Sequence, residues 1–577
     1  MVWEILGVIV TLAAVVLCAI PLGKYMAKVF SGERTILSRV LHPVERGIYR
    51  VIGVQEDGEQ TWVGYLVATM VVTVLSLVFT YVLLRWQDRL PLQSTINPAG
   101  LPGVAPDLSM NTAISFTTNT NWQNYAGEST MSYLSQMLAL AFHQFLSAAT
   151  GVALAVALIR GLVRKSAKTL GNFYVDITRA TLYILLPLSV LATLLLVSQG
   201  AIQNFSAYTS GHTLSGITQT IAQGPVAAME AIKDLGNNGG GFFNSNSAHP
   251  FENPNGFTNA FEIFLILLIP FACAFMFGKL VNNMKQGVAV FGAMAILLVS
   301  LTTFAMYEEQ KGNIALNATG VTQAFTDSQS GGNMEGKSVR NGALQSAQFV
   351  ASTTNTSTGS VDASHDSLTP AGGLVPLLGI LLGEISPGGI GAGLYVMLVF
   401  AILAVFIAGL MVGRTPEYLG KKIESRDIKL AALVILVTPL SILGFTALSV
   451  LITSGQGGPL NPGPHGFSEI LYAFSSTTAN NGSAFAGLTG NTLYYNSTLG
   501  IAMWLGRVFE FIPMLALAGS MVKKKSVPFG AGTLPTDTTL FSVLLVVVII
   551  IVAVLTFFPA LALGPVLEHL QLVHSVH

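Results

Sequence analysis

Four short polar stretches stand out because each offers neutral oxygen ligands in the same order. Each is rich in Ser, Thr and Asn and closes on Gly or Asn. They read SFTTNTN at 115–121, KDLGNNG at 233–239, TTNTSTG at 353–359 and STTANNG at 476–482. A dehydrated potassium ion needs its lost water oxygens replaced by carbonyls or hydroxyls from several sides. These residue types therefore indicate a site for a monovalent cation.

The closing turns of these stretches hold no carboxylate. A filter for divalent cations is typically built from rings of Asp or Glu, so the neutral lining favours a monovalent ion. Pointing consecutive carbonyls at one axis requires positive φ, which Gly adopts freely and Asn tolerates. Ordinary turns also select Asn, Thr and Gly, and any one stretch taken alone is explained that way.

The spacing of the stretches argues for function. Their final residues, 121, 239, 359 and 482, are 118, 120 and 123 residues apart, which indicates four copies of one unit. Each copy has the order apolar span, short amphipathic segment, polar turn, apolar span. This order predicts a helix, a re-entrant pore loop and a second helix, repeated four times around a pseudo-fourfold pore like that of a potassium channel.

The composition places these units in a membrane. Of 577 residues only 10% are charged and 51% are hydrophobic, with a mean hydropathy of +0.63. The 28 Lys and Arg balance the 28 Asp and Glu, so no net field would attract nucleic acid. Cys18 and Cys273 lie in apolar runs, which excludes a disulfide framework. The chain is predicted to be an all-α integral membrane protein.

Ten apolar runs are long enough to span a bilayer. Nine are simple: 5–22, 63–84, 137–159, 177–197, 260–277, 288–305, 430–452, 499–521 and 540–558. The tenth, 374–412, is too long for one pass and is interrupted between Gly383 and Gly393 by five glycines and Pro387. We interpret it as one broken helix, whose freed backbone must be buried in protein or line a wet cavity.

The loop charges orient the spans. Ten spans place alternate loops on the same side, and 21 of the 28 Lys and Arg fall in five loops of one side, at 24–50, 160–179, 278–287, 413–429 and 523–525. By the positive-inside rule this side is cytoplasmic, so both termini are expected outside. Lys233 and Arg507 remain as possible charges at membrane depth. The first apolar run lacks a cationic leader and is expected to be an uncleaved span.

These elements divide the chain into six parts. They are an N-terminal span and cytoplasmic loop (1–55), pore repeat 1 (56–165), pore repeat 2 (166–285), pore repeat 3 with the broken second helix (286–425), pore repeat 4 (426–525) and a C-terminal span (526–577).

Longer strings resemble a known family. NWQNY at 121–125, GGGFFNSNSAHPFENP at 239–254, GRTPEYLGKK at 413–422 and NPGPHGFSE at 461–469 look like the potassium-transporting ATPase A chain, KdpA, and the match runs from the first span to the last. The family resembles a covalently fused potassium-channel tetramer.

The resemblance implies a set of site residues. The potassium filter would be formed by Asn119, Thr120, Asn121, Asn237, Asn238, Gly239, Ser357, Thr358, Gly359, Asn480, Asn481 and Gly482. Gln123 matches a position tied to selectivity. Glu384, Gly388, Gly389 and Arg507 would line the region below the filter, with the interrupted segment as a gate. Glu384 could hold that segment by pairing with Arg507.

Charges near apolar segments also have plainer explanations. Glu384 could sit at a helix end, and Arg507 could reach toward the interface. Lys233 and Asp234, on the second pore helix, are expected to pair locally or face water.

The resemblance also implies partners. The chain would be the ion-selecting, non-catalytic subunit of a bacterial plasma-membrane complex, with a separate P-type ATPase subunit (KdpB), KdpC and the small KdpF. Potassium would be its substrate, and no cofactor is expected. The sequence itself contains no nucleotide-binding or phosphorylation motif, and its inner loops are too short for a nucleotide domain. Two alternatives remain: a self-sufficient potassium channel or symporter subunit of the same superfamily, and a membrane scaffold or sensor with vestigial pore loops.

Overall fold

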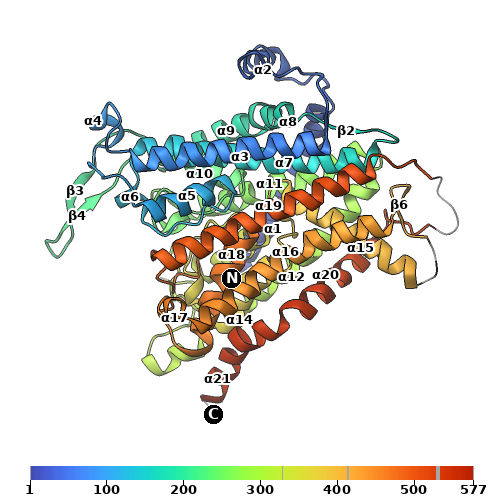
Figure 1. Ribbon diagram of the computed structural model, residues 1–577. Coiled ribbons are helices and arrows are strands. Elements are labelled where there is room, and N and C mark those ends of the chain that lie inside the picture. The colour runs from blue at the N-terminus through green and yellow to red at the C-terminus, as the bar shows by residue number, and fades with distance from the viewer. Residues whose placement is uncertain (1, 328, 412, 414, 528–532, 576–577) are drawn as a thin grey trace.

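Long helices lying side by side make up most of the computed structural model (Figure 1). It describes residues 2–327, 329–411, 413, 415–527 and 533–575. Short strands and polar loops gather at the two ends of the helical bundle: α4, α6, β3 and β4 at one end, β2 and β6 at the other (Figure 1). This is the separation that alternating loops of a multi-pass chain produce.

The predicted number of spans is confirmed, because the described residues contain ten helical runs long and apolar enough to cross a membrane. These runs are built from α1 (Val2–Phe30), α3 (Trp62–Arg85), η1 with α7 (Ser135–Ala141, Phe142–Val163), α8 with η2 and α9 (Phe173–Arg179, Ala180–Leu185, Leu186–Ser198), α11 (Gly256–Leu280), α12 (Met284–Gln310), α15 (Ala392–Met411), α16 (Ser425–Leu451), α19 (Leu493–Met521) and α20 (Thr539–Leu561).

Four shorter helices stand before the polar stretches, as the repeat predicts. These pore helices are α5 (Pro106–Thr117), α10 (Val226–Leu235), α13 (Gly342–Asn355) and α18 (Gly463–Ala479). They are too short to span a bilayer, and most of their residues are buried. Each unit is therefore helix, pore helix with loop, helix.

The broken span is also confirmed. α14 (Pro370–Leu381) is separated from α15 by residues 382–391, which we call the break. Gly383, Gly388 and Gly391 have φ of +94°, +82° and +76°, conformations that glycine adopts without a Cβ penalty. The sequence extended the break to Gly393, but helix α15 already begins at Ala392. Val412, the expected end of this span, and Arg414 of the inner string at 413–422 lie outside the described residues.

The remaining elements are short and lie mainly in the loops. Three antiparallel pairs are β1–β2 (Gln60–Thr61, Thr169–Gly171), β3–β4 (Thr209–His212, Thr218–Ile221) and β5–β6 (Glu417–Tyr418, Lys421–Lys422). Short helices are α2 (Ser38–Ile52), α4 (Gln93–Ile96), α6 (Gly127–Thr130), η3 (Asn246–Ala248), η4 (Ile314–Thr319), η5 (His365–Ser367), α17 (Thr453–Gln456), η6 (Ala562–Val566) and α21 (Leu567–Ser575).

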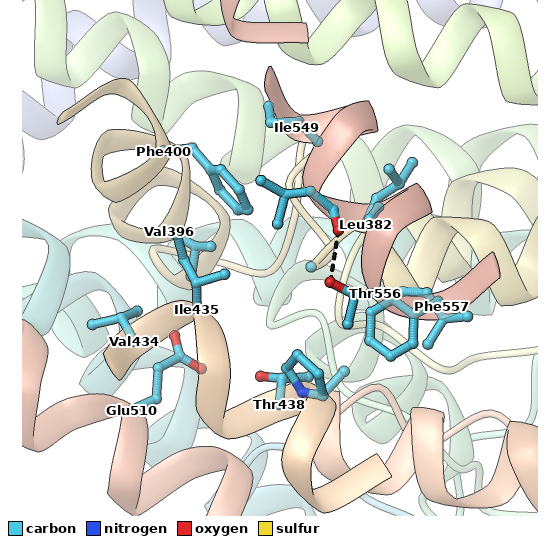
Figure 2. A pocket seen from close by; sticks show the side chains of 16 residues that line it. Leu382, Val396, Phe400, Val434, Ile435, Thr438, Glu510, Ile549, Thr556 and Phe557 are labelled. Atoms are coloured by element: carbon cyan, nitrogen blue, oxygen red, sulfur yellow. Dashed lines mark hydrogen bonds between the residues drawn. The ribbon is translucent and has the colours of Figure 1, made fainter. Parts of the chain in front are cut away.

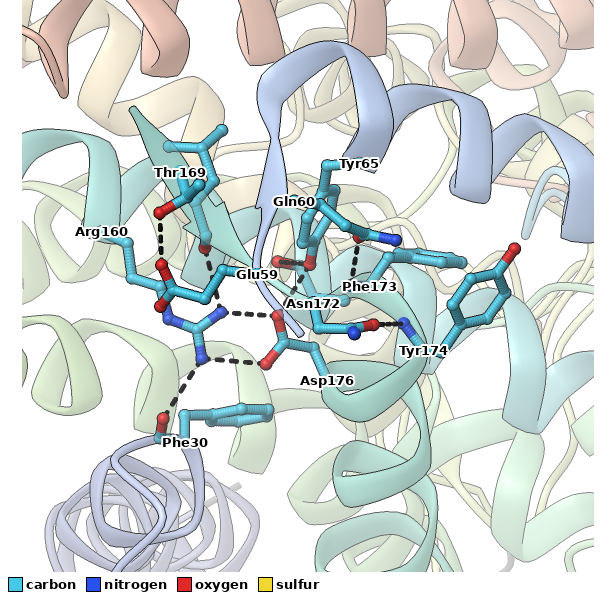
Figure 3. A network of polar contacts seen from close by, with 12 residues as sticks. Phe30, Glu59, Gln60, Tyr65, Arg160, Thr169, Asn172, Phe173, Tyr174 and Asp176 are labelled. Atoms are coloured by element: carbon cyan, nitrogen blue, oxygen red, sulfur yellow. Dashed lines mark hydrogen bonds and ion pairs between the residues drawn. The ribbon is translucent and has the colours of Figure 1, made fainter. Parts of the chain in front are cut away.

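An ion pair ties the first two repeats together where the cytoplasmic end is expected (Figure 3). The Arg160 guanidinium, at the end of α7, donates 2.9 Å to Asp176 Oδ1 on α8 and 3.2 Å to the Phe30 carbonyl that ends α1. Tyr65 on α3 donates 3.0 Å to Asp176 Oδ2 and 2.8 Å to the Ala153 carbonyl. One buried carboxylate thus fixes α1, α3, α7 and α8 relative to one another.

Candidate functional site

The four predicted loops each follow the C-terminal end of a pore helix. We call residues 119–121, 237–239, 357–359 and 480–482 the filter loops. All of these residues are buried. The C-terminal end of a helix carries a partial negative charge, which favours a cation within about one turn. Four such ends therefore act together on the space that the loops surround.

The packing around three glycines shows that the loops from all four repeats meet. A Cβ on Gly239 would lie 2.6 Å from the Thr120 carbonyl oxygen and 2.9 Å from that of Asn481. A Cβ on Gly482 would overlap the same Thr120 oxygen, and one on Gly359 would overlap the Asn481 oxygen. Only glycine fits at these three positions, because backbone carbonyls of neighbouring repeats already occupy the space where a side chain would stand.

The backbone conformation explains why asparagine opens three of the loops. The first residue has φ of +71° at Asn119, +49° at Asn237 and +63° at Asn480. Asn is among the residues that best tolerate this left-handed region. The third loop begins with Ser357, which has no positive φ, and its closing Gly359 has φ of +71° instead. Asn121 and Gly482 also have positive φ, of +57° and +101°, so positive φ alternates along the first and fourth loops, whereas the second and third loops each hold a single residue with positive φ.

Side-chain amides hold neighbouring loops together. Asn237 Nδ2 donates 2.9 Å to Thr358 Oγ1, and Asn480 Nδ2 donates 2.9 Å to Thr120 Oγ1. Asn119 Nδ2 donates 2.7 Å to the Asn237 carbonyl. These asparagine side chains therefore brace neighbouring loops against one another.

Two further asparagines of the prediction lie at the same level. Asn238 Nδ2 donates 3.3 Å to the Gln144 carbonyl, whereas the buried Asn121 amide makes no hydrogen bond to any described residue. The side chain of Asn121 is thus packed in the interior without a hydrogen bond to the described residues.

Gln123 joins the segment that follows the first filter loop to the segment that follows the second. Its Nε2 donates 2.9 Å to the Gly241 carbonyl, and its Oε1 accepts 3.1 Å from the Gly241 N–H. This two-way bond joins the first repeat to the second. The residue that the family resemblance ties to selectivity is therefore a positioning residue for the adjoining backbone.

A pocket of about 680 Å³ opens above the filter loops, on the expected outer side. All four repeats line it, through Gln123, Gly240, Gly359 and Gly482 among others. No Asp, Glu, Lys or Arg belongs to its described lining. This vestibule gives an ion access to the loops without a charged ring.

The break packs directly beneath the third filter loop. The Gly388 N–H donates 2.9 Å to the carbonyl of Asn355, at the end of α13, and Ser386 Oγ donates 2.8 Å to the Asn355 side chain. A Cβ on Gly389 would lie 2.6 Å from Ser357 Oγ. Gly389 therefore allows the chain to approach the third filter loop closely, whereas a Cβ on Gly388 would meet Glu384 and Gly393.

Glu384 and Arg507, whose pairing the sequence left open, bond to different partners within the described residues. Both side chains are buried, but Ser357 Oγ donates a short hydrogen bond to the Glu384 carboxylate. Arg507 instead donates 3.4 Å to the Ser147 carbonyl, and its guanidinium carbon lies 5.1 Å from the centre of the Phe511 ring. The partner of Glu384 is a hydroxyl of the third filter loop, because the break brings Glu384 under that loop.

Sequence reasoning missed Glu510. This residue lies on α19, three positions after Arg507, and faces a small pocket of about 60 Å³ beside the break (Figure 2). The rest of that lining is mostly apolar, with Leu382, Val396 and Phe557 among its members. The signal that could have found it is a second charge in the same apolar run.

Lys233 pairs locally, which is the first of the two alternatives expected for it, rather than facing water. Its Nζ lies 2.6 Å from Glu230 and 3.3 Å from Glu252, and the side chain is 0% exposed. Asp234, beside it, is also fully buried. Both residues belong to the packing behind the second pore helix.

Comparison with known proteins agrees with this geometry. The chain is 56% identical over 551 residues to a potassium-transporting ATPase potassium-binding subunit from Rhodospirillum centenum, covering 96% of this chain and 94% of the relative. A protein of the same description from Solibacter usitatus is 55% identical over 565 residues, covering 98% and 97%.

A solved structure shares the fold. The potassium transporter TrkH from Vibrio parahaemolyticus superposes with a TM-score of 0.50 at 14% identity, covering 90% of this chain and 98% of that protein. Residues 9–570 match the family described as KdpA, potassium-transporting ATPase A subunit. This chain therefore belongs to the KdpA family of potassium-transporting ATPase A subunits.

Proposed function

We propose that this chain takes potassium from outside a bacterial plasma membrane, selects it at the filter loops and passes it inward as the channel-like subunit of an ATP-driven uptake complex. The observation that carries the proposal is the meeting of filter-loop backbone from four repeats, with carbonyls of Thr120 and Asn481 packed against glycines of neighbouring loops, braced by neutral side chains and with no carboxylate among the filter-loop residues themselves. Such a ring replaces the water oxygens of a monovalent cation.

The ligands follow from the packing of the filter loops. Backbone oxygens of residues 119–121, 237–239, 357–359 and 480–482 would surround the ion, and Gln123 would keep the first two repeats in register. The pore helices would add their negative ends. Potassium is then the transported substrate, with no cofactor needed to hold it.

ATP hydrolysis would belong to a separate P-type subunit, KdpB, with KdpC and KdpF completing the complex. The support is the lack of a nucleotide motif in this sequence and the names of its relatives. The Arg- and Lys-rich loops would lie in the cytoplasm and both termini outside, and the support for this orientation is the bias of positive charge among the loops.

The test is to purify the chain with and without its partners. The isolated chain should hydrolyse no ATP, and the complex should hydrolyse ATP faster when potassium is added. Potassium flux by the isolated chain in proteoliposomes, at the rate of an open channel, would instead favour the self-sufficient channel or symporter. Absence of bound potassium in the complex would favour the scaffold.

A further inference from the structure

A second pocket, of about 720 Å³, lies far from the filter, between the end of α1, helix α2 and helix α8. Four arginines line it. Arg179 is neutralised, because its guanidinium lies 2.8 Å from Glu45 and 2.7 Å from Glu56. Arg34, Arg39 and Arg46 are exposed and make no ion pair within the described residues, while Glu33 is the further acid in the lining. The pocket thus carries excess positive charge.

The buried face of α2 is held in place without Arg34, Arg39 or Arg46. Glu45 accepts 2.7 Å hydrogen bonds from the hydroxyls of Tyr49 and Tyr183, besides its contact with Arg179. Glu45 and Tyr49 are 1% and 4% exposed. This contact holds α2 against α8 and η2, so the arginines are not needed to keep the helix in place.

The other two faces of α2 have different chemistry. Val40, Val44 and Val51 fall on one face at 100° per residue, and they are 71%, 49% and 88% exposed. Arg39 and Arg46 fall on an adjoining face. An apolar face beside a basic one, on a helix with a third face bound to protein, is the pattern of a helix lying in the membrane–water interface.

The orientation of α2 agrees with this pattern. Figure 1 shows α2 close to end-on, at the edge of the molecule beside α8, whereas α3 runs across the view. Helix α2 therefore lies across the direction of the spans rather than along it. The preceding and following segments belong to the end of the molecule where basic loops predominate.

We propose that α2 lies at the inner membrane surface and that Arg34, Arg39 and Arg46 bind the phosphate of an anionic phospholipid, whose acyl chains cover the valine face. Guanidinium groups bind phosphate through two parallel hydrogen bonds. The valines identify a lipid rather than free phosphate, because free phosphate would leave three exposed apolar side chains in water. The inference concerns a different part of the chain from the ion path and does not depend on it.

The test counts lipids on the purified complex. The complex, stripped of lipid in detergent, is titrated with phosphatidylglycerol or phosphatidylcholine of the same acyl chains, and native mass spectrometry measures the bound fraction. The wild type should bind phosphatidylglycerol more tightly. The triple variant Arg34→Gln, Arg39→Gln, Arg46→Gln should lose roughly a factor of five in affinity per arginine.

The matched control is Arg50→Gln, which removes an exposed charge from the same helix outside the pocket lining. It should bind phosphatidylglycerol like the wild type. Single Arg→Gln variants, each expected to lose roughly fivefold, keep the test open if the triple variant is unstable.

Four results would overturn the proposal. They are equal binding of the two lipids by the wild type, unchanged phosphatidylglycerol binding in the arginine variants, an equal loss in Arg50→Gln, and displacement of the lipid by millimolar inorganic phosphate. If the arginine variants lose the ATPase subunit while keeping the lipid, the pocket is a contact between proteins.

Discussion

The filter loops and the break lie one above the other, yet they are built on opposite plans. Above, neutral asparagine side chains bind threonine hydroxyls of neighbouring repeats, and the same pattern recurs at Asn237 and Asn480. Below, a single segment from the third repeat brings in one acid, Glu384, held by Ser357. Selecting an ion requires similar oxygens on all sides, whereas obstructing its path requires only one segment. The difference matches the two tasks that the family resemblance implies for these regions, selection at the filter loops and obstruction at the break.

The largest expected effect is at Gly482. Gly482→Asp places a Cβ into the Thr120 carbonyl, forces a non-glycine residue to φ of +101° at a cost of about 1–3 kcal/mol, and adds a charge. We expect loss of growth on limiting potassium and ATP turnover that responds to other monovalent ions. Gly239→Asp, without the positive φ, should be milder.

The control for this substitution is Gly457→Asp in an exposed outer turn, where a Cβ meets only the Thr453 carbonyl at 3.5 Å. It should keep potassium-limited growth. An unchanged preference for potassium in both filter variants would remove these loops from the filter.

The next largest effect tests the break. Deleting residues 385–391 removes the segment that bonds to Asn355 beneath the filter, so potassium should run down its gradient without ATP. Flux of potassium in proteoliposomes lacking ATP measures the leak. Deleting residues 213–217, the exposed tip between β3 and β4, is the matched control and should leave the membrane tight. A folded break deletion as tight as the wild type would show that the break is not the gate.

A smaller effect is expected at Gln123. Gln123→Ala loses both bonds to Gly241, worth about 1 kcal/mol each, so the potassium concentration for half-maximal ATP turnover should rise by up to roughly thirtyfold. Asn244→Ala, exposed in the same vestibule, should leave it unchanged. Equal effects of the two substitutions would mean that Gln123 acts only by lining the vestibule.

The smallest effect distinguishes two accounts of Glu384. Because Ser357 rather than Arg507 bonds this acid, a double-mutant cycle of Glu384→Gln with Ser357→Ala should show coupling above about 0.5 kcal/mol. The cycle of Glu384→Gln with Arg507→Gln should be additive within about 0.5 kcal/mol. The coupling energies are calculated from the apparent potassium affinity of the complex, measured for each single and double variant. A larger coupling energy between Glu384 and Arg507 than between Glu384 and Ser357 would instead support an ion pair between Glu384 and Arg507.

The sequence predicted the parts of this site that depend on order along the chain. The period near 120 residues located the filter loops, and glycines with Pro387 located the break to within two residues of the start of α15. Helix-breaking residues act locally, so their effect is readable without a fold.

Partners across repeats could not be predicted in the same way. The bond from Asn480 to Thr120 joins residues 360 positions apart, and the bond from Ser357 to Glu384 depends on how the break folds back. Neither contact produces a periodic pattern in the sequence. Glu510 differs, because a second charge close to Arg507 in the same apolar run is visible in the sequence, whereas the pocket that it faces is visible only in the fold.

The single Ser357–Glu384 contact has a consequence for how such a pore can evolve. In a channel assembled from four identical subunits, any acid under the filter appears four times, and like charges that close repel strongly. Here one continuous chain supplies all four quarters, so a substitution changes one quarter only. Linking the quarters in one chain thus allows a charge at one position of one quarter without repeating it in the other three.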